Sequence, residues 1–382
     1  MRNINKLVAN KFIGIVSTDS QKTVVEISRL YTLLVEYGTN RGGCQKDQDH
    51  PSVWVFGIPA KKTSDVRNNF ALAGSFLNPK SSILVTLDKT KDSERINREV
   101  NKDLEIISIK DGESLSAFSK RIFDISFKRN TISSNEDFVY FDNKTNPELE
   151  EYAQKIRGST ASFIGGAGPL AGARFGEILA RKISGQNNNI TGYIGGHFAG
   201  APDKNNAILG TGPDFFPYYK ETIEKLSPFA QTLSIPCNTA HAKATELSKF
   251  SEEKKMTFLD IRDATISSLK QKYPNPERVI LLSTPATIKS RLYHDKLENE
   301  GYKIIIPNEE EISSLYFSIY KIKGDEKAKN WNNDPKKTIS NVVSSIRERE
   351  GNSKIPVIFG CTEFNIPFDH TTELDTNNIV DT

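Results

Sequence analysis

Two of the three cysteines in this 382-residue chain, Cys237 and Cys361, stand in similar local sequences. Cys237 follows the apolar run "TLSIP" and precedes an Asn-Thr pair, while Cys361 follows "IPVIFG" and precedes a Thr-Glu pair. Each pattern predicts a thiol in a turn from a β-strand to a helix, at the carboxyl end of the strand, where open α/β sheets collect ligands. Backbone N–H groups and the helix dipole in such a turn lower a thiol's pKa from about 8.5, and the same N–H groups can bind a carboxylate.

Two such turns that face one cleft would form a proton-transfer device. One thiolate removes the proton α to a carboxylate from one face, and the opposing thiol returns a proton from the other face, so the two groups must differ in protonation state. For a single cysteine, a plain buried hydrophobe is the alternative interpretation. The occurrence of both turns, each with polar residues behind the thiol, favours a function. Cys44 lies in neither pattern and is interpreted as incidental.

The elements that must position these turns follow the alternation typical of βα units on parallel sheets. In the first part of the chain, strands are predicted at residues 12–17, 52–58, 81–87 and 103–109, with helical periodicity in "KTVVEISRLYTLLVEYG", closed by Gly38, and in "SLSAFSKRIFDISF". The later predicted strands are "ASFIGG", "NITGYIGG", "AQTLSIP", "RVILLST", "YKIIIP" and "KIPVIFG". The fold class is therefore α/β with doubly wound parallel sheets.

Between these two series lies a polar, turn-rich stretch with one short helix that opens at Pro147. We accordingly expect an N-terminal α/β domain at residues 1–130, a linker at 131–157 and a second domain at 158–382. "KFIGIVS" resembles "SFIGGAG". The longer segment that begins with "SSILVTLDKTKD" resembles the one that begins with "RVILLSTPATIK". The N-terminal domain is thus a candidate for a degenerate copy of the second, although chance similarity of two unrelated α/β domains is the alternative.

Composition restricts the class of protein. The chain has 51 basic and 48 acidic residues, a net charge of +3, and no long block of one sign, which argues against nucleic acid or membrane as the main partner. The apolar run near the N-terminus is shorter than that of a signal peptide, and no stretch reaches the roughly 20 apolar residues that span a bilayer. Three cysteines fit a reducing compartment. We therefore expect a soluble, cytoplasmic protein.

The motifs "IPCNTAH" and "GCTE", in this order, resemble the aspartate racemase branch of the aspartate/glutamate/hydantoin racemase superfamily. The resemblance runs from about Phe163 to the C-terminus and includes "IGGAGPLAG", "APDKNNAIL", "LLSTPATIKSRLY" and "IIPNEEEISSLYFSIYKIK". It implies two pseudo-symmetric halves, the first at about 158–255 with the C-terminal tail and the second at about 256–365. The active site would lie between them.

The same resemblance implies a racemase that needs no cofactor and no metal, with Cys237 and Cys361 as the two bases that act on an acidic amino acid, most simply aspartate. The residues expected to bind substrate are Asn238, Thr239, Thr362, Thr284, Thr287 and Gly166. His241 could orient Cys237 or the substrate amino group, or be a structural histidine. Glu363 could support the site or simply stand favourably in the first turn of a helix.

Two cations are expected to hold the distal carboxylate of the substrate. Where the family usually has Arg after "PD", this chain has Lys204, which offers a point charge in place of a bidentate fork and leaves the choice of acid open. The second cation is Lys323, with Lys321 as its rival. For each lysine, an ordinary surface position is the alternative interpretation.

Family members usually dimerise, so a homodimer, or an N-terminal domain that mimics the partner within one chain, is the expected assembly. The glycine segment with Gly166, Gly168 and Ala171 also fits G-x-G-x-x-A and would suggest a dinucleotide-binding oxidoreductase. The acidic residue expected at the end of the next strand is absent, however. A catalytically degenerate carboxylate-binding relative is the remaining alternative, and decarboxylases and maleate isomerases of the superfamily lack this cysteine arrangement. The five histidines show no metal-ligand spacing.

Overall fold

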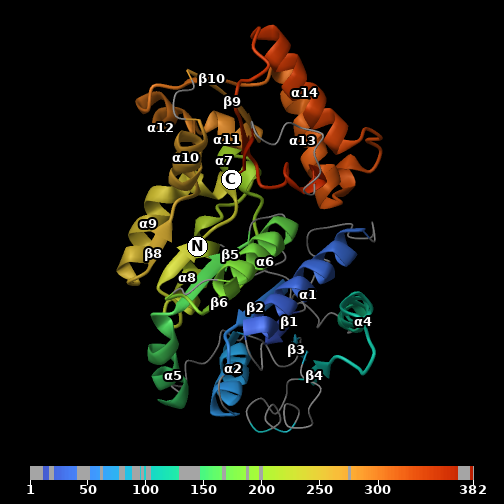
Figure 1. The fold of residues 1–382 in the computed structure, drawn as a ribbon, viewed down its shortest axis with the longest axis vertical. Helices are drawn as coiled ribbons and strands as arrows, with labels where there is room; N and C mark the ends of the chain where they lie inside the picture. The colour runs from blue at the N-terminus through green and yellow to red at the C-terminus, as the bar shows by residue number, and fades with distance from the viewer. Residues whose placement is uncertain are drawn as a thin grey trace.

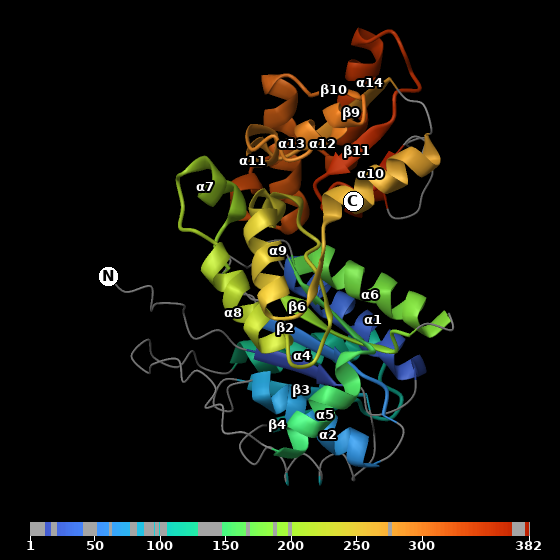
Figure 2. The ribbon, with the colours of Figure 1, turned by 90° about the vertical axis from the view of Figure 1, so that its left-hand side faces the viewer.

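The computed structural model describes residues 12–16, 21–40, 52–60, 63–76, 82–87, 95, 99, 105–128, 147–165, 169–185, 189–197, 201–273, 277–368 and 379–381. These residues form two α/β lobes, each built on its own sheet and stacked along the long axis of the molecule (Figures 1 and 2). The α/β class with mainly parallel sheets is confirmed.

The larger sheet has eight strands in the order β4-β3-β1-β2-β6-β5-β7-β8. All neighbours in it are parallel except β2 and β6, which run antiparallel. The strands are β1 (Phe12–Val16), β2 (Ser52–Gly57), β3 (Ser82–Thr86), β4 (Glu105–Ser108), β5 (Thr160–Ile164), β6 (Gly192–His197), β7 (Thr232–Ser234) and β8 (Thr257–Leu259).

Helices cover both faces of this sheet. Side chains that alternate along a strand point to opposite faces, so Val53 and Val55 of β2 pack in one hydrophobic cluster while Trp54 and Phe56 pack in the other. The helices of the first cluster are α1 (Gln21–Asn40), α4 (Leu115–Lys128) and α6 (Pro169–Gly185). Those of the second are α2 (Thr63–Phe76), α5 (Pro147–Arg157), α8 (Phe216–Leu226) and α9 (Ala244–Glu253).

The smaller sheet has four parallel strands in the order β10-β9-β11-β12. Its strands are β9 (Arg278–Ser283), β10 (Lys303–Ile305), β11 (Val357–Gly360) and β12 (Ile379–Asp381). On one face pack α13 (Glu309–Lys323) and α14 (Pro335–Arg349), and on the other α10 (Ile261–Lys272) and α12 (His294–Asn299). The remaining short helices are α7 (Lys204–Leu209), α11 (Pro285–Lys289), η1 (Asn238–Lys243), η2 (Glu326–Ala328) and η3 (Ile366–Phe368).

Strand order repeats along the chain. The strands β5 to β8 lie side by side in the order β6-β5-β7-β8, that is second, first, third, fourth along the chain. The strands β9 to β12 have the same order, β10-β9-β11-β12. The expected pseudo-symmetry of the two racemase-like halves is therefore present in the topology. The N-terminal strands β1 to β4 repeat this order once more.

Three strand pairings bear on the expected domain boundaries. The described strands of residues 1–130, β1 to β4, share the sheet of the first half, because β2 pairs with β6. Strand β8 pairs with β7, so the first half extends past residue 256. The described part of the C-terminal tail, β12, pairs with β11 in the second half.

Glycines allow the two sets of strands to meet. A methyl group on Gly196 would lie 2.2 Å from the carbonyl oxygen of Val53, and one on Gly192 would lie 2.9 Å from that of Gly57. Side chains larger than hydrogen at these positions would hold β2 away from β6. The glycine-rich sequence of β6 thus explains how the N-terminal strands join the sheet.

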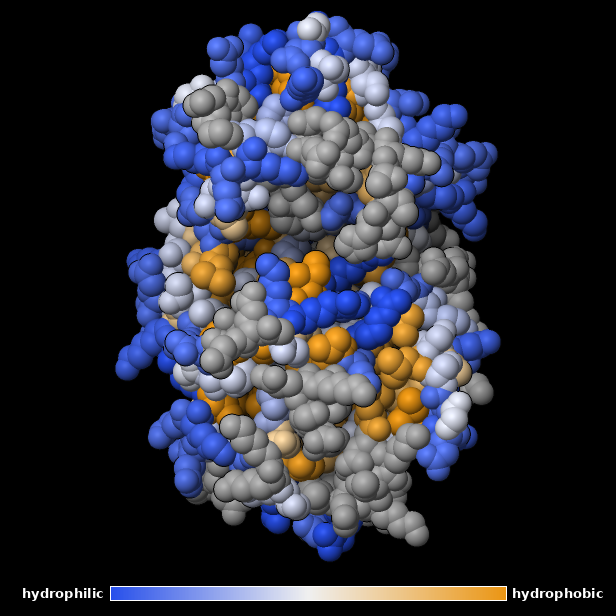
Figure 3. All heavy atoms as spheres, in the orientation of Figure 1, coloured by the Kyte–Doolittle hydropathy of each residue, from blue (hydrophilic) through white to orange (hydrophobic). Residues whose placement is uncertain are grey.

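The face seen in Figure 3 is largely hydrophilic at both ends of the molecule, with hydrophobic atoms gathered nearer the middle. Large hydrophobic side chains exposed among the described residues are Ile178, Leu259, Ile306 and Phe317. None of the helices in the described ranges is long and apolar enough to cross a membrane.

Candidate active site

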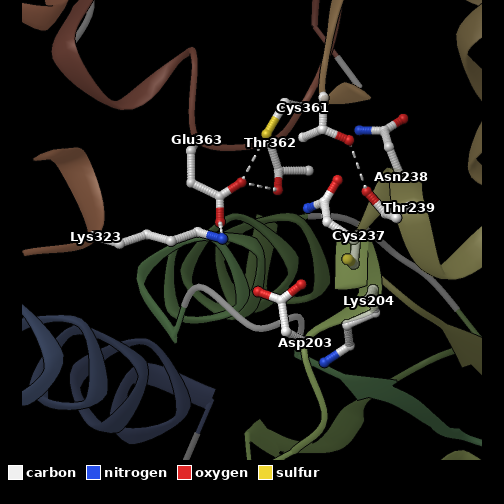
Figure 4. Close-up of a pocket in the computed structure, with 11 residues that line it drawn as sticks. Asp203, Lys204, Cys237, Asn238, Thr239, Lys323, Cys361, Thr362 and Glu363 are labelled. Atoms are coloured by element: carbon white, nitrogen blue, oxygen red, sulfur yellow. Dashed lines mark hydrogen bonds and ion pairs between the residues drawn. The ribbon is translucent and has the colours of Figure 1, made fainter. Parts of the chain in front are cut away.

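Cys237 and Cys361 line the same pocket, although they come from different sheets. Cys237 follows β7 in the large sheet, and Cys361 follows β11 in the small one. With its opening included, the pocket encloses about 380 Å³ not filled by protein atoms, part of which is open to solvent. Its lining residues are Asp203, Lys204, Asn205, Cys237, Asn238, Thr239, Thr284, Lys323, Cys361, Thr362 and Glu363, all drawn in Figure 4.

The backbone of Cys237 is held by hydrogen bonds on both sides. Its N–H donates to the carbonyl of Ile235 at 2.7 Å, and its own carbonyl accepts from the N–H of Ala240 at 3.2 Å. Cys237 is the N-cap residue of η1 and is half-buried. The thiol therefore stands at the entrance to a short helix, as the sequence predicts, on a backbone with little freedom.

His241 supports Cys237 through the backbone and does not line the pocket. Its Nε2 accepts a hydrogen bond from the N–H of Ile261 at 3.2 Å, so its Nδ1 carries the proton and donates to the Cys237 carbonyl at 3.0 Å. The ring is buried, and this burial lowers the pKa of His241 to about 4. His241 is therefore neutral near pH 7.

Cys361 is buried and belongs to a chain of polar contacts. Its thiol donates to Glu363 Oε2 at 3.0 Å, the hydroxyl of Thr362 donates to the same oxygen at 3.2 Å, and Lys323 Nζ lies 3.5 Å from Glu363 Oε1. Figure 4 shows the four side chains along one wall of the pocket. Glu363 therefore connects the thiol to the ammonium group of Lys323.

The electrostatics of Cys361 differ from the prediction. Burial raises its pKa, and the neighbouring Glu363 carboxylate raises it further, so the group is a thiol near neutral pH. The predicted lowering by a helix dipole is wrong here because turn residues and η3, not an α-helix, follow β11. Burial alone would also raise the pKa of Glu363, but Lys323 and the hydrogen bond from Cys361 hold it below its usual value.

Three threonines join the two halves beside the cysteines. The Thr239 hydroxyl lies 3.2 Å from that of Thr284 and 3.1 Å from that of Thr287, and the latter two are 3.1 Å apart. Thr239 and Thr284 line the pocket, whereas Thr287 lies behind them and is fully buried. Thr287 thus positions the other two hydroxyls.

Asn238 is oriented by a residue that the sequence did not single out. Its Oδ1 accepts a hydrogen bond from the hydroxyl of Tyr293, which is fully buried. With the carbonyl end of the amide engaged, the NH₂ end is the one that can donate toward the pocket. Tyr293 is the last residue of the motif "LLSTPATIKSRLY", but the motif alone assigned it no role.

Asp203 is a further pocket residue that the sequence did not single out, although it directly precedes Lys204. It caps α7 by accepting from the N–H of Asn206 at 2.8 Å, and in Figure 4 its carboxylate points toward the space between Lys323 and Cys237. Lys204 lines the pocket and is buried, and its Nζ lies 5.7 Å from the centre of the Tyr219 ring. Gly166 lies outside the described residues.

The pocket thus brings together two thiols, an amide, several hydroxyls, two lysines and two carboxylates, and Lys323 and Glu363 among them form an ion pair. Within the described ranges, no group of three or more His, Cys, Asp or Glu side chains is placed to hold a metal ion.

Comparison with known proteins identifies the family of this chain. The chain is similar to Picrophilus torridus aspartate racemase, with 24% identity over 59% of this chain and 89% of that one, at a TM-score of 0.45. It is also similar to an aspartate racemase homologue from Pyrococcus horikoshii OT3, with 19% identity over 58% and 92% of the two chains, at a TM-score of 0.41. The family model for Asp/Glu/hydantoin racemases matches residues 164–382, more than half of the chain, and this protein belongs to that family.

Proposed function

We propose that this protein interconverts the L and D forms of an acidic amino acid, aspartate in the first place, by proton transfer between Cys237 and Cys361 without a cofactor. The observation that supports this most directly is that two cysteines from different sheets line one small pocket. Family membership supports the same class of reaction. The glycine segment that resembled a dinucleotide-binding motif falls mostly within the family match and needs no nucleotide to explain it.

In the proposed reaction, the Cys237 thiolate takes the α-proton from one face of the substrate. The C–H bond breaks, an S–H bond forms, and the electron pair is delocalised into the α-carboxylate. The Cys361 thiol then gives its proton to the other face and becomes a thiolate. The raised pKa of Cys361 suits it to begin as the acid, and the reverse reaction exchanges the roles of the two groups.

Donors around the pocket would hold the substrate during this transfer. The NH₂ group of Asn238 and the hydroxyls of Thr239 and Thr284 can bind the α-carboxylate, where they would also stabilise the charge that develops on it. Thr362 can join them if its hydroxyl turns from Glu363 to the substrate. Asp203 adds an acceptor for the ammonium group. Lys323, which would share its charge with Glu363, and Lys204 are the cations proposed for a distal carboxylate. The Lys204 ammonium group lies beside the Tyr219 ring and would have to turn toward the substrate.

Proton exchange in heavy water tests the proposal. The purified protein is incubated with L-aspartate, L-glutamate or L-alanine in D₂O without added cofactor, and α-deuterium and D-isomer are followed by NMR and chiral chromatography. Because one group removes the proton and another returns a solvent-derived one, D-aspartate should carry deuterium from the earliest times while the remaining L-aspartate is still protonated. Binding of L-aspartate by calorimetry without any exchange would instead indicate a non-catalytic relative.

Single cysteine variants test the assignment of the two bases. We expect Cys237→Ala and Cys361→Ala each to reduce racemisation by at least about a hundredfold, because each removes an acid or base from the transition state. Cys44→Ala, which changes a cysteine outside both motifs, is the matched control and should retain wild-type rates. Rapid turnover by either of the first two variants would disprove the paired mechanism.

A further inference from the structure

Helix α1 of the N-terminal region reaches the end of strand β6. The hydroxyl of Tyr31 lies 2.9 Å from Nδ1 of His197, and their rings are stacked with centres 5.8 Å apart and an interplanar angle of 12°. Both residues are buried, Tyr31 completely. A buried hydrogen bond therefore links the N-terminal region to the last residue of β6.

His197 is at the carboxyl end of β6, an interior strand of the large sheet. Strands β6, β5 and β7 are parallel, so their carboxyl ends lie on one side. From this side the chain continues beyond β7 to Cys237 and beyond β6 to Asp203 and Lys204. His197 is thus the last sheet residue that precedes Asp203 and Lys204 in the chain, and both of these line the pocket.

The surroundings of His197 leave little room for movement. The N–H of Gly165, just after β5, donates to the carbonyl of Gly196 at 2.7 Å, and a methyl group on Gly165 would lie 3.1 Å from Cβ of His197. A methyl group on Gly172 of α6 would lie 3.0 Å from Cα of Gly165 and 3.8 Å from the Tyr31 hydroxyl. The hydroxyl is therefore enclosed where α1, α6 and the ends of β5 and β6 meet.

We propose that Tyr31 is a positioning residue for the racemase site: its hydroxyl fixes the His197 imidazole and, through it, the strand end from which the chain runs to Asp203 and Lys204. The N-terminal region then contributes to substrate binding without touching the substrate. This inference rests on the proposed function for its kinetic consequence only, because the geometry of residues 201–209 can be measured without turnover.

The same helix offers a matched control. The Ser28 hydroxyl lies 2.5 Å from the hydroxyl of Tyr193, also between α1 and β6 but near the beginning of the strand, away from the site. Tyr31→Phe and Ser28→Ala each remove one buried hydroxyl from the same contact between helix and strand. A purely structural role predicts similar effects for both variants.

The experiment compares both full-length variants with the wild type by steady-state racemisation and by amide hydrogen exchange. For Tyr31→Phe we expect KM for the acidic amino acid to rise about five- to tenfold, the factor that one hydrogen bond corresponds to, with a smaller change in kcat. Exchange in residues 201–209 should become faster. Ser28→Ala should leave both readouts unchanged, although its melting temperature also falls.

Variants of His197 complete the test. His197→Leu should reproduce the effect of Tyr31→Phe, the double variant should be no worse than either single one, and His197→Asn, which keeps a polar atom near the Nδ1 position, should recover part of the loss. Equal exchange of residues 201–209 in Tyr31→Phe and Ser28→Ala would overturn the inference. If the wild type lacks racemase activity, the proposed function fails, and the exchange comparison still decides the role of Tyr31.

Discussion

The two cysteines are chemically unequal in the resting protein. Cys361 donates to a carboxylate in a buried setting, whereas Cys237 is half-buried at the start of η1. The sequence pointed to both thiols because each follows an apolar strand and precedes polar residues. It left the role of Glu363 open, since two residues separated by one position meet only if the turn between them folds their side chains to the same side.

Tyr293 provides a test of substrate orientation at the residue scale. Its hydroxyl holds the carbonyl end of the Asn238 amide, so Tyr293→Phe would let the amide rotate and point its oxygen at the substrate carboxylate. We expect KM for aspartate to rise about tenfold while the fold is kept, because a single hydrogen bond near a charge is lost. The measurement is steady-state racemisation.

Tyr302→Phe is the control for this change, because Tyr302 is buried in the same hydrophobic cluster as Tyr293 and does not line the pocket. An unchanged KM in Tyr293→Phe would show that the amide is held by other contacts.

At the scale of elements, residue patterns predicted those strands and helix ends that depend on neighbouring residues alone. The alternation of apolar residues located β1 to β4 within two residues of their observed ends, and Pro147 begins α5 as predicted. Where longer-range contacts decide, the prediction failed: α1 continues past Gly38 to Asn40, and no α-helix directly follows Cys361. The capping of α7 by Asp203 was also missed, although Asp is a preferred N-cap residue.

His241 bonds to Cys237 at the start of η1 and to Ile261 at the start of α10, so its titration should change the free energy of unfolding. Its pKa is about 4 in the folded protein and about 6.5 when unfolded, so between these values the unfolded chain binds the extra proton. Stability due to the neutral ring is complete above pH 6.5 and is lost as the pH falls toward 4. Over this range the free energy of unfolding should fall by about 3 kcal/mol.

Urea unfolding of the wild type and His241→Gln at several pH values measures this effect. The variant should be less stable at pH 7 and should lack the His241 contribution to the slope between pH 6.5 and 4, while other titrating groups affect both proteins alike. Parallel curves across that range would show that His241 does not titrate as its surroundings indicate.

For the whole molecule, the topology clarifies how the N-terminal region relates to the rest. The similarity of "KFIGIVS" to "SFIGGAG" joins β1 and β5, which are the first strands of their sets. The other similarity aligns β3, the third strand of the set β1 to β4, with β9, the first strand of the set β9 to β12. The strand order therefore does not support it. Sequence periodicity could not reveal the shared sheet, because the pairing of β2 with β6 connects distant parts of the chain through glycines that carry no pattern of their own.

We infer from this pairing that the N-terminal region takes the place of a second subunit. Without it, β6 would be the outer strand of the set β6-β5-β7-β8, and its buried "GYIGGH" sequence would form an open edge ready to pair with another chain. With β2 in that position the edge is covered within one chain. We therefore expect sedimentation equilibrium to give a monomer of 42.7 kDa at micromolar concentration.

Glycine variants test whether the pairing of β2 with β6 is what keeps the protein monomeric. Gly196→Ala places a methyl group 2.2 Å from the Val53 carbonyl oxygen, so it should part β2 from β6 and cause self-association or loss of stability. Gly158→Ala adds the same group where nothing lies within 4 Å and should sediment like the wild type. A wild-type homodimer would contradict the inference, because an edge that β2 already occupies cannot also pair with a second copy of β6.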